Sequence, residues 1–413
     1  MNKTIVSTLS YVFFNGVTQV FSLVFMLILM YDLDVANFSK YNVIVSLVAI
    51  FSFLIDGGLT GYIIKEYNSR KFKLSVDSDE KNAFINGVMS YQFLFIVILL
   101  IAYTITAYFY SDEDNLFHFI LFGFLTLVLG IFNPLFAILL AEQKRIYIIF
   151  KDITASILRL SVLCLAIFSL QRQELIYYIP AGSLVVSLLC FCYLKNKFKL
   201  QFLSGTFFEC ATIKNITLSV FPFLLLSFFN IVYNKIDVLM LEKMSSIEEV
   251  GFYAGATIFV YPFMFVCSAA SSVILPMLTR VQSTASFENQ EKVLIGLMSF
   301  IGVSLSMVLF IFSSFFYEHL FNGKYYPSLS VYEVLVWYLA VVFTYTVFSN
   351  ALIAVGKIKV LILLNAIMLM LNVIFNTQLI PLYGALGAAW ATVMSEVIIL
   401  LFMFYYKIKL NHA

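Results

Sequence analysis

Apolar runs long enough to cross a bilayer fill almost the whole chain. A transmembrane helix needs about 20 apolar residues. Cutting the 413-residue sequence at charged or turn-rich breaks leaves twelve such runs, at 5–30, 40–64, 83–110, 115–141, 146–170, 174–194, 213–241, 250–279, 292–317, 329–355, 358–380 and 384–406. Hydrophobic residues make up 62% of the chain, and no soluble core could hide so many. We therefore predict an all-α, polytopic integral membrane protein of about twelve transmembrane helices.

The composition also argues against several other classes. Charged residues are 12% of the chain, against about 25% in a soluble domain, and no basic tract indicates a nucleic-acid partner. The five cysteines form no CxxC pair or Cys/His cluster, so we expect neither a metal nor a disulfide. No Walker A pattern is present, and no cofactor is expected. The run 5–30 is too long for a signal-peptide core and is interpreted as a retained first helix.

Lysine and arginine predict the orientation, because they concentrate in cytoplasmic loops. With a cytoplasmic amino terminus, 19 of the 25 basic residues fall in cytoplasmic segments and 5 in outer ones, and Arg159 lies within a span. We therefore expect both termini on the cytoplasmic side of the membrane. All predicted loops are short, so the function should reside in the membrane.

Two segments indicate an internal repeat. VANFSKYN (35–42) resembles IEEVGFYA (247–254), with Tyr41 matching Tyr253 at an offset of 212. LLAEQKRIY (139–147) resembles IAVGKIKVL (353–361), with Lys144 matching Lys357 at an offset of 213. An even number of spans per half makes the repeat parallel, as in some transporters. We predict two pseudo-symmetric six-helix lobes, 1–200 and 201–413, around a central cavity.

Polar side chains at helical spacing mark faces that could line this cavity. One stripe in the first span contains Thr8, Tyr11, Asn15, Gln19 and Ser22; the seventh span has Ser219, Ser227, Asn230, Asn234 and Asp237; the eleventh has Asn365, Asn372 and Asn376. Among these, the candidate substrate-binding residues are Asn15, Asn230, Asn234, Asp237 and Asn372. The alternative is that the amides only join helix to helix.

Charged residues inside the spans are stronger signals, because an ionised side chain in lipid is costly. Arg159 is a candidate ligand for phosphate, which guanidinium binds in a bidentate manner. Asp56 and Glu396 are candidate ion-coupling residues. The structural alternative is an Asp56–Arg159 ion pair that locks the first lobe. Lys235 lies off the polar face of its helix, and its side chain can extend to the headgroups.

Several segments in order resemble a known family. They are IDGGL (55–59), NKIDVLMLEKMSSIEEVGFYAGA (234–256), LPMLTR (275–280), FNGKYYPS (321–328) and NVIFNTQLIPLYGALGAAWATVMSE (372–396). The chain resembles the polysaccharide flippases of the multidrug/oligosaccharidyl-lipid/polysaccharide exporter superfamily, especially O-antigen-unit flippases. The resemblance implies two six-helix lobes in the bacterial inner membrane and transport of undecaprenyl-pyrophosphate-linked oligosaccharide from the cytoplasmic to the periplasmic leaflet. It also implies cationic residues for the anionic head, for which Arg159 is the first candidate and Lys65 and Lys235 are the next.

These expectations make the protein a transporter and not an enzyme. Its partners would be the lipid-linked oligosaccharide, membrane lipid and other polysaccharide-assembly proteins such as the polymerase. We expect alternating access driven by an ion gradient. A multidrug/cation antiporter of the same fold is the first alternative. A membrane enzyme such as an O-antigen polymerase is the second, but it would require a large outer loop that this chain lacks.

Overall fold

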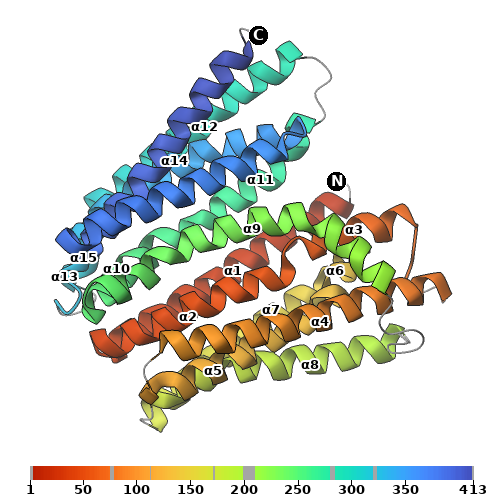
Figure 1. The fold of residues 1–413 in the computed structure, drawn as a ribbon, viewed down its shortest axis with the longest axis horizontal. Coiled ribbons are helices and arrows are strands. Elements are labelled where there is room, and N and C mark those ends of the chain that lie inside the picture. The colour runs from red at the N-terminus through yellow and green to blue at the C-terminus, as the bar shows by residue number, and fades with distance from the viewer. Residues whose placement is uncertain are drawn as a thin grey trace. The chain divides into compact units, whose positions relative to one another are not determined.

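The computed structural model describes residues 3–74, 79–111, 113–170, 173–198, 210–279, 284–319 and 323–411, and its helices are drawn in Figure 1. The first half contains α1 (Lys3–Asp32), α2 (Val35–Asp56), α3 (Leu59–Ser69), α4 (Asp79–Tyr110), α5 (Glu113–Val128), η1 (Leu129–Phe132), α6 (Asn133–Ala141), α7 (Ile146–Cys164), η2 (Leu165–Ser169), η3 (Gln173–Tyr178) and α8 (Ile179–Phe198). The second half contains α9 (Cys210–Met244), α10 (Ile247–Val260), η4 (Tyr261–Phe263), α11 (Met264–Thr279), α12 (Thr284–Ile311), α13 (Ser313–His319), α14 (Ser328–Ala354) and α15 (Ile358–Asn411).

The twelve predicted spans are confirmed by these helices. Ten helical segments of the described chain are long and apolar enough to cross a membrane. One of them is α15, which is interrupted at Gly384 by a non-helical φ of 54°, so it supplies two spans. The twelfth is α7, whose 19 residues include the charged Lys151, Asp152 and Arg159 and which is therefore less apolar than the ten.

The chain divides into two compact units whose boundaries fall inside helices α1, α2 and α9. Unit 1 contains residues 1–25 and 47–228, and unit 2 contains 26–46 and 229–413. The turn between α1 and α2 therefore belongs to unit 2, and the first half of α9 belongs to unit 1. The predicted lobe boundary at 200/201 lies outside the described residues.

The core of unit 1 is built where α3, α4, α6 and the first half of α9 bury their apolar faces. Its members include Leu59, Ile63, Tyr67, Phe84, Ile85, Val88, Leu135, Ile138, Leu139, Ile216 and Val220. The expected continuous span at 40–64 is instead broken between α2 and α3. Gly57 and Gly58 have φ values of 40° and 91°, which favour glycine. A Cβ on Gly58 would lie 2.3 Å from Cβ of Phe223, so IDGGL is a tight break and not only a thinned helix.

The core of unit 2 surrounds α14, the most buried of its spans. This helix packs against α10, α11, α12 and α15. Both of its faces bury apolar side chains. On one face Val331, Tyr332, Leu335, Val336, Leu339, Phe343 and Val347 are each at most 2% exposed, and on the opposite face Phe348 is 4% exposed. A helix that is apolar all round is expected at the centre of a bundle.

The internal repeat extends to the backbone hydrogen bonds. The N–H of Lys144 donates to the carbonyl five residues earlier at 2.8 Å, and the N–H of Lys357 does the same at 2.8 Å. The preceding residue has a positive φ in both turns, 60° at Gln143 and 75° at Gly356. These equivalent turns, at the ends of α6 and α14, are separated by the same offset of 213 that the sequence predicts.

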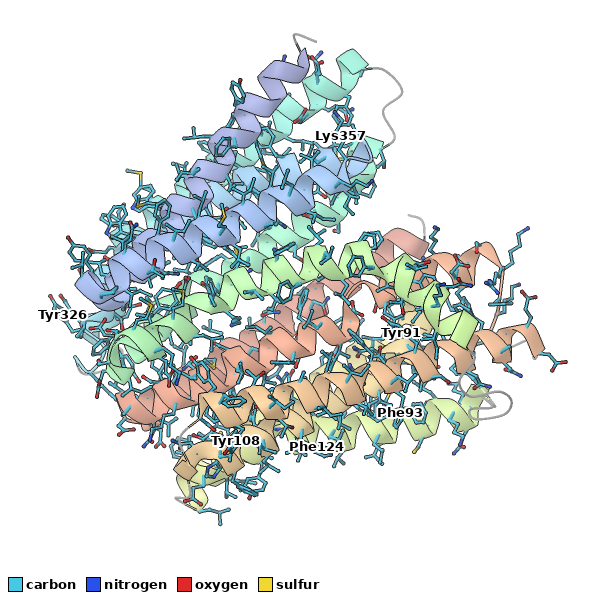
Figure 2. The ribbon with its side chains drawn as sticks, viewed as in Figure 1. Tyr91, Phe93, Tyr108, Phe124, Tyr326 and Lys357 are labelled. Atoms are coloured by element: carbon cyan, nitrogen blue, oxygen red, sulfur yellow. The ribbon has the colours of Figure 1, made fainter. Side chains whose placement is uncertain are left out.

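Large apolar side chains project outward from the helices, as Figure 2 shows for Phe93, Tyr108 and Phe124 in unit 1. Their exposed fractions are 46%, 66% and 51%. Exposure of this kind would be unfavourable in water and is favourable in a bilayer, where the surrounding acyl chains are equally apolar. The helices of unit 1 are therefore built to contact lipid directly.

Candidate functional site

Asp237 is the most completely enclosed carboxylate among the candidate residues. It lies on α9 in unit 2 and is 1% exposed. Its Oδ2 accepts hydrogen bonds from the hydroxyls of Tyr253, at 2.6 Å, and Thr392, at 2.7 Å. Its Oδ1 accepts from the side-chain amides of Asn376, at 2.7 Å, and Asn372, at 3.1 Å. Three helices, α9, α10 and α15, thus converge on one side chain, and we call these five residues the Asp237 cluster.

The break in α15 allows this convergence. Asn372 and Asn376 are one helical turn apart before the break, and the Asn376 amide also donates to Asn372 Oδ1 at 2.9 Å. Thr392 follows the break. Because both arms of α15 (drawn in Figure 1) contribute donors to Asp237, the change of direction near Gly384 is needed to complete the cluster.

A carboxylate of α10 holds this break in place. The backbone N–H of Ala385 donates to Glu249 Oε2 at 2.6 Å, and a Cβ on Gly384 would lie 2.4 Å from the same oxygen. A second glycine, Gly387, approaches the Leu379 carbonyl so closely that a Cβ would lie 2.3 Å from it. The YGALG motif therefore has a structural explanation: its glycines allow the chain to turn sharply under Glu249.

The carboxylate of Asp237 is surrounded by neutral donors alone. No lysine or arginine pairs with it in the described chain. An ionised group buried without a counter-ion is costly even when it is hydrogen-bonded. Rotation of both asparagine amides by half a turn would present two carbonyl oxygens in place of the NH₂ groups. The cluster could then surround a small monovalent cation with oxygen atoms only, as hard cations prefer.

Glu396 lies one helical turn after Thr392 and is 3% exposed. Its Oε2 is buried and accepts no hydrogen bond within the described residues. The hydroxyl of Tyr233, on α9, lies 3.1 Å from the Thr392 carbonyl and 3.2 Å from the Ser395 hydroxyl. Asp237 and Glu396 therefore occupy the same seam between α9 and α15, separated by one turn of each helix.

Clusters of three or more His, Cys, Asp or Glu side chains do not occur among the described residues. A transition-metal centre therefore has no ligand set in that part of the chain. The chemistry that the Asp237 cluster supports is binding of a proton or of a monovalent cation.

Two predicted residues of the seventh span, Asn230 and Asn234, lie apart from this cluster. Asn230 is exposed. The side-chain amide of Asn234 donates to the backbone carbonyl of Asn230 at 2.8 Å and to Asn230 Oδ1 at 3.3 Å. Lys235 is half-buried on the same helix. The structure thus brings Asp237 together with Asn372, and leaves the two asparagines bonded to each other along α9.

The remaining candidates lie in unit 1. Arg159 is half-buried on α7, and its Nη2 donates to the hydroxyl of Ser156 at 3.0 Å. Asp56 ends α2 and accepts a hydrogen bond of 2.5 Å from Thr60, at the start of α3. Asn15 is half-buried on α1. The side chains of Thr8 and Tyr11 lie outside the described residues.

Sequence reasoning did not select three members of the cluster as site residues. Asn376 is part of the polar stripe of the eleventh span, and Tyr253 is the residue that matches Tyr41 in the internal repeat. Thr392 had only one signal, its position one turn before the intramembrane Glu396, which places both on one face of the helix. A buried hydroxyl beside a carboxylate is detectable only when the partner helix is known.

Comparisons with known proteins place this geometry in context. A sequence model of the family described as polysaccharide biosynthesis protein matches residues 5–282. A structure described as lipid II flippase MurJ, in an inward closed conformation, matches with a TM-score of 0.76 and 15% identity, covering 96% of this chain and 87% of that chain. An inward-facing multidrug resistance MATE family transporter of the MOP superfamily matches with a TM-score of 0.70 and 14% identity. This match covers 100% of this chain and 99% of that chain.

A Vibrio cholerae MATE transporter, VcmN, has the same fold, with a TM-score of 0.66 and 10% identity over 99% of this chain and 97% of that chain. No curated protein sequence matches this chain. At these identities the structural likeness establishes the fold.

Proposed function

Because the chain belongs to the polysaccharide biosynthesis protein family, we propose that it is a flippase for lipid-linked oligosaccharide. Its substrate would be an O-antigen-type repeat unit on undecaprenyl pyrophosphate, moved from the cytoplasmic to the periplasmic leaflet of the bacterial inner membrane. The family match carries this proposal. The likeness of the fold to a lipid II flippase supports it, since that protein is named for a lipid-linked substrate.

Translocation of such a lipid is a problem of solvation. The sugar-phosphate head is insoluble in the hydrocarbon layer, whereas the apolar polyprenyl tail dissolves in it. A transporter must offer the head a polar, partly cationic path and leave the tail in the lipid. Alternating access to the two sides provides this path without opening a continuous pore.

Arg159 is the proposed contact for the pyrophosphate. Its guanidinium is permanently charged and suits phosphate oxygens geometrically. Asn15, Asn230 and Asn234 are the proposed hydrogen-bonding residues for the sugar, because the exposed or half-buried amides can exchange partners with hydroxyl groups. Lys65 and Lys235 remain secondary candidates for the head.

The buried Asp237 cluster supports coupling to a cation. A proton or monovalent cation that binds there would neutralise the only formal charge of the cluster. Its release would leave an uncompensated carboxylate between α9, α10 and α15, so occupancy favours a different packing of these helices. Glu396 would act at the same seam and Asp56 at the break between α2 and α3. Asn372 and Asp237, which the sequence predicts as substrate ligands, are instead proposed to bind the ion.

Reconstitution tests the function directly. Full-length protein in liposomes that contain lipid-linked oligosaccharide should accelerate exchange of the sugar head between leaflets, detected with a lectin or a membrane-impermeant oxidant. A sodium or proton gradient should increase the net rate. Head exchange no faster than in protein-free liposomes would overturn the proposal.

A multidrug/cation antiporter is the second candidate, because MATE transporters have the same fold. Dye efflux in cells that lack other pumps distinguishes the two. The antiporter function predicts dye export and intact surface polysaccharide after deletion of the gene, and the flippase function predicts the reverse.

A further inference from the structure

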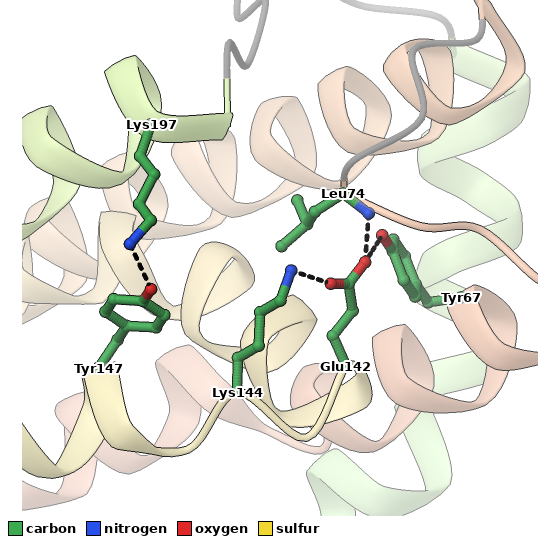
Figure 3. Close-up of polar contacts among 6 residues, drawn as sticks. All are labelled: Tyr67, Leu74, Glu142, Lys144, Tyr147 and Lys197. Carbon is green, nitrogen blue, oxygen red and sulfur yellow. Dashed lines mark hydrogen bonds and ion pairs between the residues drawn. The ribbon is translucent and has the colours of Figure 1, made fainter.

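A basic corner lined with aromatic rings lies where the turn between α6 and α7 meets the end of α8. Lys197 donates to the hydroxyls of Tyr147, at 2.7 Å, and Tyr193, at 3.1 Å. Its ammonium also lies 5.0 Å and 5.3 Å from the centres of these two rings. Figure 3 shows Lys197 reaching down to Tyr147 beside the Lys144–Glu142 pair. We call Lys197, Tyr147 and Tyr193 the α8 corner.

The carboxylates nearby are already engaged. Glu142 pairs with Lys144 at 2.5 Å and accepts from the Tyr67 hydroxyl at 2.8 Å and from the N–H of Leu74. Asp152 pairs with Lys151 at 2.9 Å. Neither Lys195 nor Lys197 has a carboxylate partner among the described residues.

The corner therefore holds one exposed ammonium group, that of Lys197, without a counter-ion. An ammonium has three N–H donors, and Lys197 uses two of them on tyrosines. The third, and the hydroxyl hydrogens of Tyr147 and Tyr193, remain available to an anion. Two tyrosine rings beside the lysine also fix its position, which lowers the entropy lost on binding.

The side chains that precede the corner along α8, and follow it along α7, include exposed apolar residues. Leu189, Tyr193 and Lys197 follow one another at intervals of four residues on α8, so they form one line along the helix. Leu189 is 62% exposed and Tyr193 is 54% exposed. Phe150, on the neighbouring α7, is 70% exposed. Along α8 the surface thus changes from apolar, through amphipathic, to cationic.

This order matches one molecule, a phospholipid with an anionic headgroup. Its acyl chains would lie along Leu189 and Phe150, and its phosphate would reach Lys197. The outward exposure of these residues argues for a lipid of the surrounding bilayer. The distribution of basic residues predicts this end of α8 to be cytoplasmic, and basic pockets between helices on that side are suited to acidic headgroups.

We propose that the α8 corner is a binding site for an anionic glycerophospholipid, whose phosphate is held by Lys197 and by the hydroxyls of Tyr147 and Tyr193. The site concerns the annular lipid and does not depend on the identity of the transported substrate.

Lipid titration of the purified full-length protein followed by native mass spectrometry tests this site. Wild-type protein should bind phosphatidylglycerol more tightly than phosphatidylcholine. Lys197→Gln should weaken phosphatidylglycerol binding by roughly fivefold, the effect of one basic residue, and leave phosphatidylcholine binding unchanged. Tyr147→Phe with Tyr193→Phe keeps the rings and should give a smaller loss of the same preference.

Lys73→Gln is the matched control, since it removes one exposed charge on the same predicted side of the membrane. It should retain the preference for phosphatidylglycerol. Equal affinity of the wild type and the Lys197→Gln variant for phosphatidylglycerol would overturn the site. Thermal stabilisation of the wild type by millimolar inorganic phosphate equal to that by phosphatidylglycerol would overturn the assignment to a lipid.

Discussion

The hydroxyl of Tyr253 on α10 donates a hydrogen bond of 2.6 Å to the carboxylate of Asp237 on α9. Both side chains are buried in unit 2. Tyr253 is also one of the residues that revealed the internal repeat, so a position marked by duplication contributes to the most enclosed acidic group of the candidate site. A tyrosine hydroxyl stabilises the carboxylate without neutralising it, and the charge remains available to a mobile cation.

Asp237→Asn should uncouple transport from the ion gradient. The amide keeps the size of the side chain and removes its charge, so a bound cation gains nothing there. We expect the ion-stimulated part of the transport rate to fall by about 5–150-fold, the usual range of coupling energies. Thermal stability should be unchanged or higher, because an uncompensated buried charge is gone. Lys243→Gln, at the end of the same helix, is the control, and an equal loss there would contradict the assignment.

Arg159→Gln should reduce oligosaccharide export in cells at normal protein levels. Loss of a charge-assisted contact costs about 1.5–3 kcal/mol, or roughly 10–150-fold in apparent affinity for the pyrophosphate. Arg159→Lys retains the charge but not the bidentate geometry, so it should lie in between. Lys151→Gln, two turns earlier on α7, should keep most of the activity. Wild-type export by Arg159→Gln would remove this residue from substrate binding.

Gly384→Ala should destabilise the protein by about 1–3 kcal/mol, since its φ of 54° suits glycine and its Cβ would collide with Glu249. The readout is the unfolding temperature in detergent. The double variant Gly384→Ala with Glu249→Ala should lose less stability than the sum of the two single variants. The reason is that the Cβ of residue 384 no longer collides with the Glu249 carboxylate. Gly296→Ala in α12 is the control. Its Cβ would meet no atom within 4 Å, so the free energy of unfolding should be unchanged or slightly higher.

Lys324 should make stability depend on pH in the alkaline range. It lies in the loop before α14 and donates to the backbone carbonyls of Met30 and Leu33 at the end of α1. Burial lowers the pKa of Lys324 below its ordinary value of 10.5, although Asp34 and Asp32 oppose this effect. Between the lowered pKa and 10.5 the unfolded chain binds more protons than the folded one, so this residue's contribution to stability rises with pH.

The measurement is the unfolding temperature between pH 8 and pH 11, compared with Lys324→Gln. The difference between wild type and variant should move in favour of the wild type as pH approaches 10.5 and become constant above it. Lys243→Gln serves as a control, since this half-exposed lysine pairs with Glu242. A difference that is constant over the whole range would contradict the lowered pKa.

The orientation of the chain can be read with reporter fusions. The excess of basic residues in alternate loops predicts a cytoplasmic carboxyl terminus, so a fluorescent protein fused after Ala413 should fluoresce. A fusion to alkaline phosphatase after Tyr326, between α13 and α14, should be active outside. The opposite pattern would invert the predicted topology.

The number of spans was predictable because each depends on a local property. Twenty apolar residues in succession have few alternatives to a membrane helix, since the bilayer leaves no other way to satisfy the backbone hydrogen bonds. The repeat was predictable for a related reason: Lys144 and Lys357 end equivalent turns, and the turn itself is defined by hydrogen bonds over five residues.

The partners of the polar residues were less predictable. Helical spacing placed Asn230, Asn234 and Asp237 on one face within about 60° of arc. The structure separates them, because Asp237 meets Tyr253 and the arms of α15, whereas Asn234 bonds back to Asn230. Periodicity reports which residues share a helix face and says nothing of what packs against each turn of that face.

The sequence by itself determined the membrane-spanning class, the twelve helices and the repeat, because hydrophobic length and turn geometry are properties of contiguous residues. Only the tertiary structure decided that Asp237, Tyr253, Asn372, Asn376 and Thr392 form one cluster. These residues are spread over more than 150 positions. They meet because Gly384 lets α15 change direction under Glu249, which is a matter of packing between distant helices.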